Sequence, residues 1–176
     1  MGGQPPVAIA LGLLSSESIQ VLDSSKQYQT PAYPLGSGPD YVNSVVLCST
    51  TLSRSELLAR LHEIEQLVGR TRKKRWEPRV IDLDIIDYAG QVAPDKDTFQ
   101  EWFDLPLDQQ MKCAPEQLIL PHPRMQDRPF VLVPMRDITP NWVHPVTGLS
   151  LNQMLARFGA KELAEIRPIA DADSSS

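Results

Sequence analysis

The spacing of apolar residues predicts one long helix near the middle of the chain. Within Ser53–Val68 the apolar side chains recur at the period of a helix that buries one face. Ser53 and Glu56 have the spacing of a capping box at the start of this helix, and Gly69 is a natural stop at its end. The apolar stripe comprises Leu57, Leu61, Ile64, Leu67 and Val68.

Shorter apolar runs predict strands that interleave with the helices. Residues 30–39 hold three prolines and two glycines and are predicted to form a loop. The interleaving favours an α+β sandwich with a mainly antiparallel sheet over a doubly wound parallel sheet. The predicted strands are Val7–Leu11, Ile19–Thr30, Tyr41–Thr51, Val80–Tyr88 and Phe130–Met135, and a last short helix is predicted over Leu151–Phe158.

Length and composition fit a single domain that spans residues 1–176. The chain is 41% hydrophobic and 22% charged, which allows a packed core. Residues 94–117 are polar, with aromatic and leucine residues at the spacing of short amphipathic helices, and we expect a peripheral insertion there. Residues 171–176 are expected to form a disordered tail.

Positive charge is concentrated in one short segment of an otherwise acidic chain. Residues 70–79 contain six of the 17 basic residues and carry a net charge of +5, in a chain whose net charge is −5. Such a segment suits an anion, whereas a nucleic-acid binder is usually basic over a whole face. No apolar run approaches the roughly 20 residues that span a bilayer, and two cysteines make no disulfide framework. We therefore expect a cytoplasmic protein that binds neither nucleic acid nor membrane.

Asp82 and Asp84 are the sharpest candidates for chemistry. Alternate residues of a strand share a face, so the two carboxylates would project together, roughly 6.6–6.8 Å apart along the chain. The apolar residues between and beside them would then point to the core. Paired carboxylates suit Mg²⁺, which prefers hard oxygen ligands and keeps several waters. A solvent-exposed edge strand with two ordinary acids is the alternative.

The basic segment directly precedes these aspartates and strengthens the case for phosphate chemistry. Arginine pairs with phosphate oxygens in a bidentate fashion, and carboxylate-bound Mg²⁺ opposite arginines is the arrangement of phosphoryl transfer. A solvated run of charge is the competing interpretation. The chain has neither a Walker sequence nor the catalytic-loop set of protein kinases, so ATP would bind in another way.

Several motifs, in the same order, resemble those of the hydroxymethyldihydropterin pyrophosphokinases. The most specific is Arg75-Trp76-Glu77-Pro78-Arg79-Val80-Ile81-Asp82-Leu83-Asp84-Ile85. The others include Tyr28-Gln29-Thr30-Pro31, Pro39-Asp40-Tyr41-Val42-Asn43, Leu120-Pro121-His122-Pro123 and Arg128-Pro129-Phe130. The resemblance covers most of residues 7–158. It implies a ferredoxin-like α+β sandwich that transfers pyrophosphate from ATP to 6-hydroxymethyl-7,8-dihydropterin and releases AMP.

The resemblance also implies a role for each matching residue. Asp82 and Asp84 correspond to the ligands of two Mg²⁺ ions, and Arg70 and Arg79 to catalytic-loop arginines that contact the phosphates. Trp76 corresponds to a loop tryptophan that helps to cover the active centre. Lids of this kind exclude water once the substrates are bound.

The implied substrate sites combine aromatic rings that stack on the pterin with polar groups that bind its edge and the nucleotide. Tyr41 and Phe130 correspond to the aromatic pair that stacks on the pterin, although either alone would be interpreted as a core residue. Asn43 corresponds to the amide that binds the edge of the pterin, and Thr30 and Leu35 to backbone contacts. The implied nucleotide site comprises Glu65, Arg70, His122 and Arg128, whereas His62 and His144 match no motif and are interpreted as structural or surface residues.

The chain departs from the family pattern at three places. The N-terminal strand of the family leads through a Gly-Ser-Asn-like turn into a helix, but here the next predicted strand follows Gly12 almost at once. The missing helix would have roughly 10–14 residues. We expect residues omitted from this sequence to supply it, because its loss would expose one face of the sheet. Glu77 replaces the usual glycine of the loop motif, and Pro123 stands where other members carry an aromatic residue.

Two other functions remain open on the sequence. A ferredoxin-like module could hold RNA with the basic loop and exposed aromatic residues, in which case affinity would fall steeply with salt and need no Mg²⁺. A catalytically inactive relative would keep the fold without turnover. Release of AMP from ATP separates both from a pyrophosphokinase.

Overall fold

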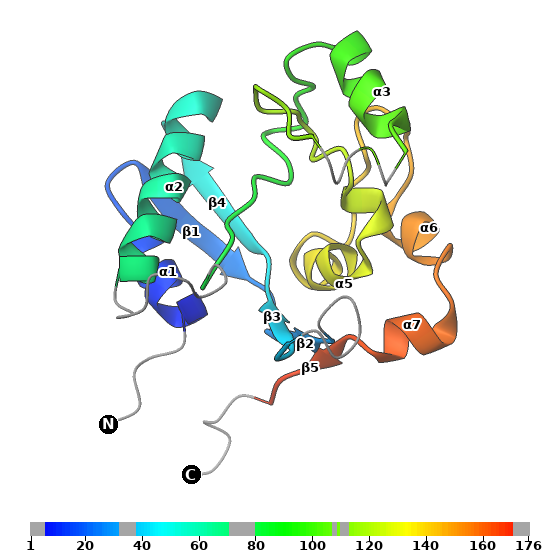
Figure 1. Cartoon of the computed structure of the whole chain (residues 1–176), viewed down its shortest axis with the longest axis horizontal. Helices are drawn as coiled ribbons and strands as arrows, with labels where there is room; N and C mark the ends of the chain where they lie inside the picture. Colours follow the sequence, from blue (N-terminus) through cyan, green and yellow to red (C-terminus); the bar gives the residue numbers. More distant parts are fainter. Residues whose placement is uncertain (1–5, 32–37, 71–79, 107–108, 110–112, 171–176) are drawn as a thin grey trace. The chain divides into compact units, whose positions relative to one another are not determined.

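In the described part of the chain, a first helix is followed by a group of strands, then by a run of helices and a last short strand, as the computed structural model in Figure 1 shows. Residues 6–31, 38–70, 80–106, 109 and 113–170 are described. In chain order the elements are α1 (Pro6–Leu14), β1 (Ile19–Ser24), β2 (Tyr28–Thr30), β3 (Tyr41–Asn43), β4 (Val46–Thr50), α2 (Arg54–Arg70), α3 (Lys96–Asp104), the 3₁₀ turn η1 (Met125–Asp127), α5 (Pro129–Ile138), α6 (Leu151–Leu155), α7 (Ala160–Ala164) and β5 (Arg167–Pro168).

The chain forms two compact units, each built from two stretches of sequence. The first unit comprises residues 1–22 and 48–123, and the second comprises residues 23–47 and 124–176. β1 pairs with β4, and a separate sheet has the strand order β3-β2-β5, in which both pairings of β2 are antiparallel. These sheets, together with the helices, confirm the predicted α+β fold class.

The core of the first unit is built around α2. Leu61, Ile64 and Val68 lie on one face of this helix and are buried. α1 lies beside α2 and packs against it, with Ala10 buried against Ile64 and Val68 (Figure 1). An amphipathic helix gains most of its stability from such a buried face, so the contact with α1 stabilises both helices.

The predicted start of α2 is confirmed in detail. Glu56 Oε2 accepts a hydrogen bond from the backbone N–H of Ser53 at 2.8 Å, and Ser53 Oγ accepts one from the backbone N–H of Glu56 at 3.4 Å. The hydrogen bonds from Ser53 lower the pKa of the Glu56 carboxyl. This reciprocal pair is a capping box, which satisfies two backbone donors at the start of the helix.

The predicted strand Val7–Leu11 is wrong, because these residues belong to helix α1. A short apolar run does not by itself distinguish a strand from a buried helix. Here Pro6 is the first helical residue, a position where its missing N–H costs nothing. The helix turns Ile9, Leu13 and Leu14 toward the buried residues of α2.

The two longer predicted strands are each divided in two, and the breaks face one another. Residues 19–30 form β1 and β2, and residues 41–51 form β3 and β4. Between them the backbone N–H of Ser25 donates to the carbonyl of Val45 at 2.9 Å, while the N–H of Val45 donates to Ser25 Oγ at 2.9 Å. A side-chain hydroxyl thus replaces one backbone acceptor, which ends the regular ladder at this point.

The predicted strand Val80–Tyr88 is also wrong, since these residues belong to no sheet in the described part of the chain. The alternation that suggested a strand is nevertheless present. Ile85 is buried and Leu83 is half-buried, whereas Asp82 and Asp84 are exposed. The apolar residues pack against the buried face of α2, so tertiary packing rather than a strand ladder fixes this segment.

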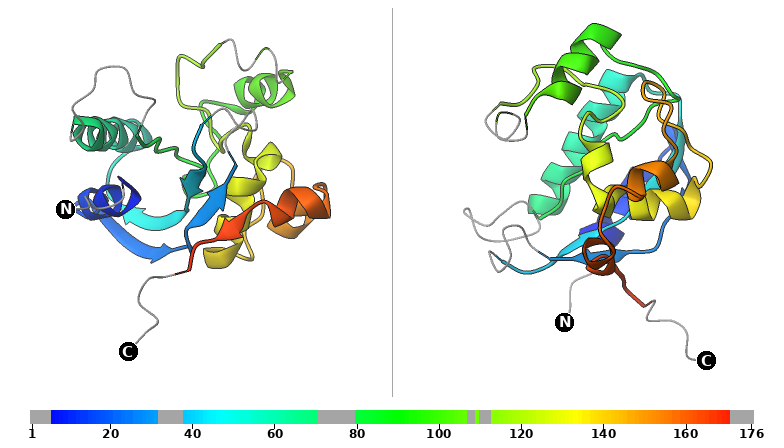
Figure 2. Two further views of the ribbon diagram at one scale, coloured as in Figure 1. Left: turned by 60° about the horizontal axis from the view of Figure 1, so that its bottom comes forward. Right: turned by 90° about the vertical axis from the view of Figure 1, so that its right-hand side faces the viewer.

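In the second unit the predicted strand Phe130–Met135 is wrong, because these residues form most of helix α5. Pro129 occupies the first turn, and Leu132 and Met135 are buried on one face. α5 packs against β2, β3 and α6. β5, which the sequence pattern did not reveal, runs alongside β2 (Figure 2).

Two short helices follow the sequence predictions. Residues 94–117 contain α3, whose Phe99 is fully buried and whose start is capped by Asp95 through a 2.8 Å bond from the N–H of Thr98. The predicted helix Leu151–Phe158 is confirmed as the shorter α6. No helix in the described ranges is long and apolar enough to cross a membrane.

Candidate functional site

The two predicted metal ligands project from one side of their segment. Asp82 and Asp84 are exposed, while Ile81, Leu83 and Ile85 turn toward the core of the first unit. The arrangement is the one expected from the alternation of residues in an extended chain. It supplies two carboxylates side by side, with an apolar anchor between them.

Glu65 of α2 approaches this segment from the helix. Its Oε1 accepts a hydrogen bond from the backbone N–H of Leu83 at 2.6 Å. Leu83 lies between Asp82 and Asp84, so the bond is made at the centre of the acidic pair. Glu65 was predicted to contact the nucleotide, and its contact with the backbone is a feature that the sequence motif did not reveal.

His122 lies next to the same segment through its backbone. Its N–H donates to the carbonyl of Ile86 at 2.8 Å. The preceding Pro121 is buried, and His122 itself is half-buried. One region of the first unit therefore contains Glu65, the Asp82–Asp84 pair and His122.

Magnesium fits the donor set that Asp82 and Asp84 offer. Mg²⁺ is commonly bound by one or two carboxylates together with waters and substrate phosphates, without a full cage of protein ligands. Within the described residues no three His, Cys, Asp or Glu side chains gather into a cluster that could hold a metal by themselves. Two exposed carboxylates can therefore hold the ion only if the substrate or water supplies the remaining oxygens.

Three of the predicted pterin residues, Thr30, Tyr41 and Asn43, lie on the β2–β3 pair. Thr30 is directly opposite Tyr41, and Tyr28 is opposite Asn43. Asn43 Nδ2 donates to Thr30 Oγ1 at 2.8 Å, so these two side chains touch. Tyr41 is 57% exposed, which leaves its ring available for stacking.

Tyr28 anchors this pair of strands to helix α5. Its phenol donates to Asp137 Oδ2 at 2.7 Å. Burial, followed by the hydrogen bond and the charge of Asp137, raises the pKa of Tyr28 to about 12. The phenol is thus held neutral as a structural donor beside the candidate residues.

Arg128 and Phe130 lie at the start of α5. Arg128 is the N-cap residue, and its guanidinium carbon is 6.0 Å from the centre of the Phe130 ring. Phe130 is half-buried. A positive charge at a helix N-terminus, next to an aromatic ring, suits a ligand that carries both an anionic group and a flat ring.

Four predicted residues cannot be placed in the same way. Leu35, Trp76 and Arg79 lie outside the described residues. Arg70 is the last residue of α2, and its side chain also lies outside the described part.

The two histidines that matched no motif were predicted to be structural or surface residues, and the structure places one in the core and one on the surface. His144 is fully buried, and its Nδ1 accepts hydrogen bonds from the backbone N–H groups of Val146 and Thr147, each at 3.2 Å. Its ring packs edge-on to Trp142, with centroids 5.7 Å apart. His62 is exposed on α2.

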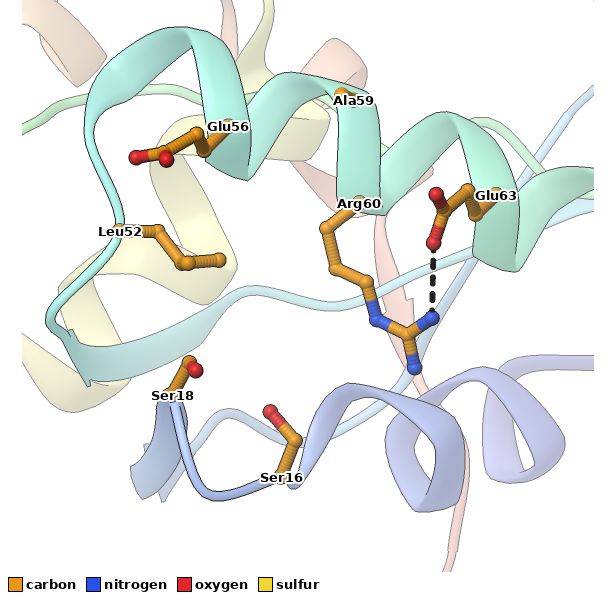
Figure 3. A pocket seen from close by; sticks show the side chains of 7 residues that line it. All are labelled: Ser16, Ser18, Leu52, Glu56, Ala59, Arg60 and Glu63. Carbon is orange, nitrogen blue, oxygen red and sulfur yellow. Dashed lines mark hydrogen bonds and ion pairs between the residues drawn. The ribbon is translucent and has the colours of Figure 1, made fainter.

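A pocket of about 330 Å³ lies in the first unit, where the turn after α1 faces α2 (Figure 3). Arg60 of α2 pairs with Glu63 of the same helix at 3.1 Å. It also donates to the carbonyl of Leu13, at the end of α1, at 3.1 Å. The lining residues are Ser16, Ser18, Leu52, Glu56, Ala59, Arg60 and Glu63, none of which is a predicted site residue.

Comparison with known proteins agrees with the motifs. Residues 4–140 match the family model described as 7,8-dihydro-6-hydroxymethylpterin-pyrophosphokinase (HPPK). The chain is 36% identical, over 150 residues, to the 2-amino-4-hydroxy-6-hydroxymethyldihydropteridine pyrophosphokinase of Synechocystis sp.; the match covers 85% of this chain and 66% of that protein. It is 32% identical to the enzyme of the same name from Methylorubrum extorquens, over 83% of this chain and 78% of that protein.

A longer relative shares the same region. The folic acid synthesis protein fol1 of Pneumocystis carinii is 31% identical over 159 residues, which cover 90% of this chain but 19% of that protein. The chain thus spans about two thirds of the Synechocystis relative and about a fifth of the Pneumocystis one. On the extent of the family match, the chain belongs to the 7,8-dihydro-6-hydroxymethylpterin-pyrophosphokinase family.

Proposed function

We propose that this chain transfers pyrophosphate from ATP to the hydroxymethyl group of 6-hydroxymethyl-7,8-dihydropterin. The products are AMP and the pterin diphosphate, an intermediate of folate biosynthesis. The observation that carries the proposal is the exposed Asp82–Asp84 pair on an apolar segment packed against α2. We propose further that residues 1–176 act as one catalytic domain in the cytoplasm, with residues 94–117 as a peripheral insertion.

Asp82 and Asp84 are proposed to hold two Mg²⁺ ions. Bound there, the metal would neutralise charge on the triphosphate and orient the attacking hydroxyl. The two carboxylates would hold the ions, with water and the phosphates supplying the remaining oxygens. Arg70 and Arg79 are proposed to contact the phosphates, and Trp76 to cover the reacting groups.

The remaining nucleotide contacts are proposed at His122 and Arg128. His122 lies beside the acidic segment through its bond to Ile86, which supports a contact near the metal end of the nucleotide. Arg128 offers a guanidinium at the N-terminus of α5. Glu65 was also assigned to the nucleotide by resemblance, but its bond to Leu83 supports a different role, developed below.

The pterin is proposed to stack on Tyr41 and Phe130. The exposed ring of Tyr41 supports this role, as does the contact of α5 with β3. Asn43 offers the edge of the pterin its amide oxygen and its second N–H, and its bond to Thr30 holds the amide in place. Leu35 is proposed to contribute a backbone contact. The substrates are small molecules, with no role for nucleic acid or membrane.

The product of ATP cleavage tests the proposal directly. With ATP, Mg²⁺ and the hydroxymethyl pterin, the protein should form AMP and the pterin diphosphate in equal amounts, and AMP should not form without the pterin. Formation of ADP or free phosphate alone would contradict the proposal.

Substitution of the acidic pair tests the site. Asp82→Ala and Asp84→Ala should each lower turnover at least about 100-fold, because each removes a group that stabilises charge in the transition state. The circular dichroism spectrum should not change, since both residues are exposed. Asp97→Ala, at an exposed acid of α3, is the matched control and should turn over like the wild type. Turnover within tenfold of wild type in either site variant would exclude the metal role.

A further inference from the structure

The hydrogen bond from Leu83 to Glu65 links the acidic segment to α2 at one well-defined point. The distance from Leu83 N to Glu65 Oε1 is 2.6 Å, and the bond is partly buried. Residues 80–88 belong to no sheet in the described part of the chain, so here a carboxylate takes the place that a strand ladder would otherwise provide. Backbone N–H groups away from water need such a partner.

The side chain of Leu83 provides a second attachment to the same helix. It packs against the cluster that contains Leu61 and against the cluster that contains Ile64 and Val68. All three are on the buried face of α2. Leu83 is therefore held to one helix by its side chain and by its backbone N–H.

This double attachment acts on the torsions that orient the two aspartates. The N–H of Leu83 belongs to the peptide group that joins Asp82 to Leu83. Fixing that peptide plane fixes ψ of Asp82 and φ of Leu83, and only two such torsions per residue are soft. With the half-buried side chain of Leu83 also packed against α2, the carboxylates of Asp82 and Asp84 are both directed outward.

We propose that Glu65 is a positioning residue, which holds the Asp82-Leu83-Asp84 backbone so that the two carboxylates bind metal together. The proposal rests on the proposed function, in which these aspartates are the Mg²⁺ ligands. This role differs from the nucleotide contact implied by resemblance. Here the Glu65 side chain is long enough to accept a hydrogen bond from the backbone of Leu83, and it does not contact ATP.

Three substitutions of Glu65 separate the effect of its side-chain length from the effect of its charge. Glu65→Gln keeps an oxygen acceptor at the same distance from the helix and loses the charge. Glu65→Asp keeps the charge but is one methylene too short to reach Leu83. Glu65→Ala loses both. Glu63→Ala is the matched control, because Glu63 is exposed on the same helix and pairs only with the half-buried Arg60 in the described structure.

The dependence of turnover on Mg²⁺ is the first readout. Loss of a group that orients a metal ligand typically costs 10–100-fold in metal affinity or activity. We expect the Mg²⁺ concentration for half-maximal turnover to rise about tenfold in Glu65→Ala and Glu65→Asp. It should stay within about threefold of wild type in Glu65→Gln and Glu63→Ala. The KM for ATP at saturating Mg²⁺ should change little in all four.

The amide proton of Leu83 is the second readout, and it does not depend on activity. In NMR spectra of the ¹⁵N-labelled protein without substrates, this proton should be shifted downfield and protected from exchange in wild type and Glu65→Gln. Both properties should be lost in Glu65→Ala and Glu65→Asp. This measurement tests the hydrogen bond between Leu83 and Glu65 even if the wild type forms no AMP. Failure of the proposed function and failure of this inference are therefore distinguishable.

Two results would overturn the inference. One is a Glu65→Gln variant as impaired as Glu65→Ala, which would show that the charge is what matters. The other is an unchanged Leu83 amide in Glu65→Ala. If Glu65→Ala does not fold, the Gln and Asp variants carry the test alone, since their predicted behaviour is opposite.

Discussion

Ile64 offers the most direct test of how the first unit is built. Its side chain is fully buried on α2, between Ala10 of α1 and the apolar residues of the segment that carries Asp82 and Asp84. Both neighbours were predicted as strands, and neither is one. Truncation to alanine therefore probes how α1 and the acidic segment pack on α2.

The expected cost follows from the atoms removed. Ile64→Ala deletes three carbons, and at about 0.8 kcal/mol for each buried methylene the transfer loss is about 2.4 kcal/mol. A cavity adds to this loss, because α1 and the acidic segment can close around it only in part, so we expect about 3–4 kcal/mol in total. Leu67 lies on the same helix but is 43% exposed, and Leu67→Ala should cost less than about 1 kcal/mol.

Urea unfolding followed by circular dichroism measures the difference. With a slope of about 2 kcal/mol per molar urea, a loss of 3 kcal/mol lowers the midpoint by about 1.5 M. If the midpoint of Ile64→Ala lay within about 0.3 M of that of Leu67→Ala, the packing of α1 and of the acidic segment on α2 would be refuted.

Two further predictions concern the second unit. Because the pKa of Tyr28 is raised to about 12, above its ordinary value of 10.0, the neutral phenol stabilises the fold fully below pH 10, and this stability is lost as the pH rises toward 12. Tyr28→Phe removes the bond to Asp137, should cost about 1 kcal/mol at neutral pH, and should show a smaller loss between pH 10 and 12 in urea titrations; equal losses in both proteins would contradict the assignment. Ser150 and Gln153 form the capping box of α6, so Ser150→Ala should lower stability by about 1 kcal/mol, whereas Asn152→Ala at an exposed position should have little effect in the same assay.

Local sequence determined the features that depend on neighbouring residues. The capping box and apolar stripe of α2 are encoded within one segment, and the helix begins one residue after the predicted cap. The alternation at Asp82 and Asp84 likewise fixed which side chains face outward, although the segment is not a strand. Both patterns hold because side-chain direction follows from backbone periodicity alone.

The motifs also predicted the family, and the match to the family model over residues 4–140 confirmed it. By their position in the motif, Asp82 and Asp84 were assigned as Mg²⁺ ligands. This agrees with the alternation of residues, which places both carboxylates on one side of the segment. The motifs did not reveal that Glu65 binds the backbone between the two. The signal available in the sequence was an acid directly after Ile64, at the edge of the apolar stripe, and such acids are common on helices.

Tertiary structure alone decided the short apolar runs. Val7–Leu11 and Phe130–Met135 are each compatible with a strand or a buried helix, and both are helical here because one packs on α2 and the other on β2 and β3. The division of the longer strands depends on Ser25 meeting Val45, twenty residues away in sequence. A local pattern specifies which face of a segment is apolar, whereas the surface that covers that face, and therefore the secondary structure a short segment adopts, is set by residues distant along the chain.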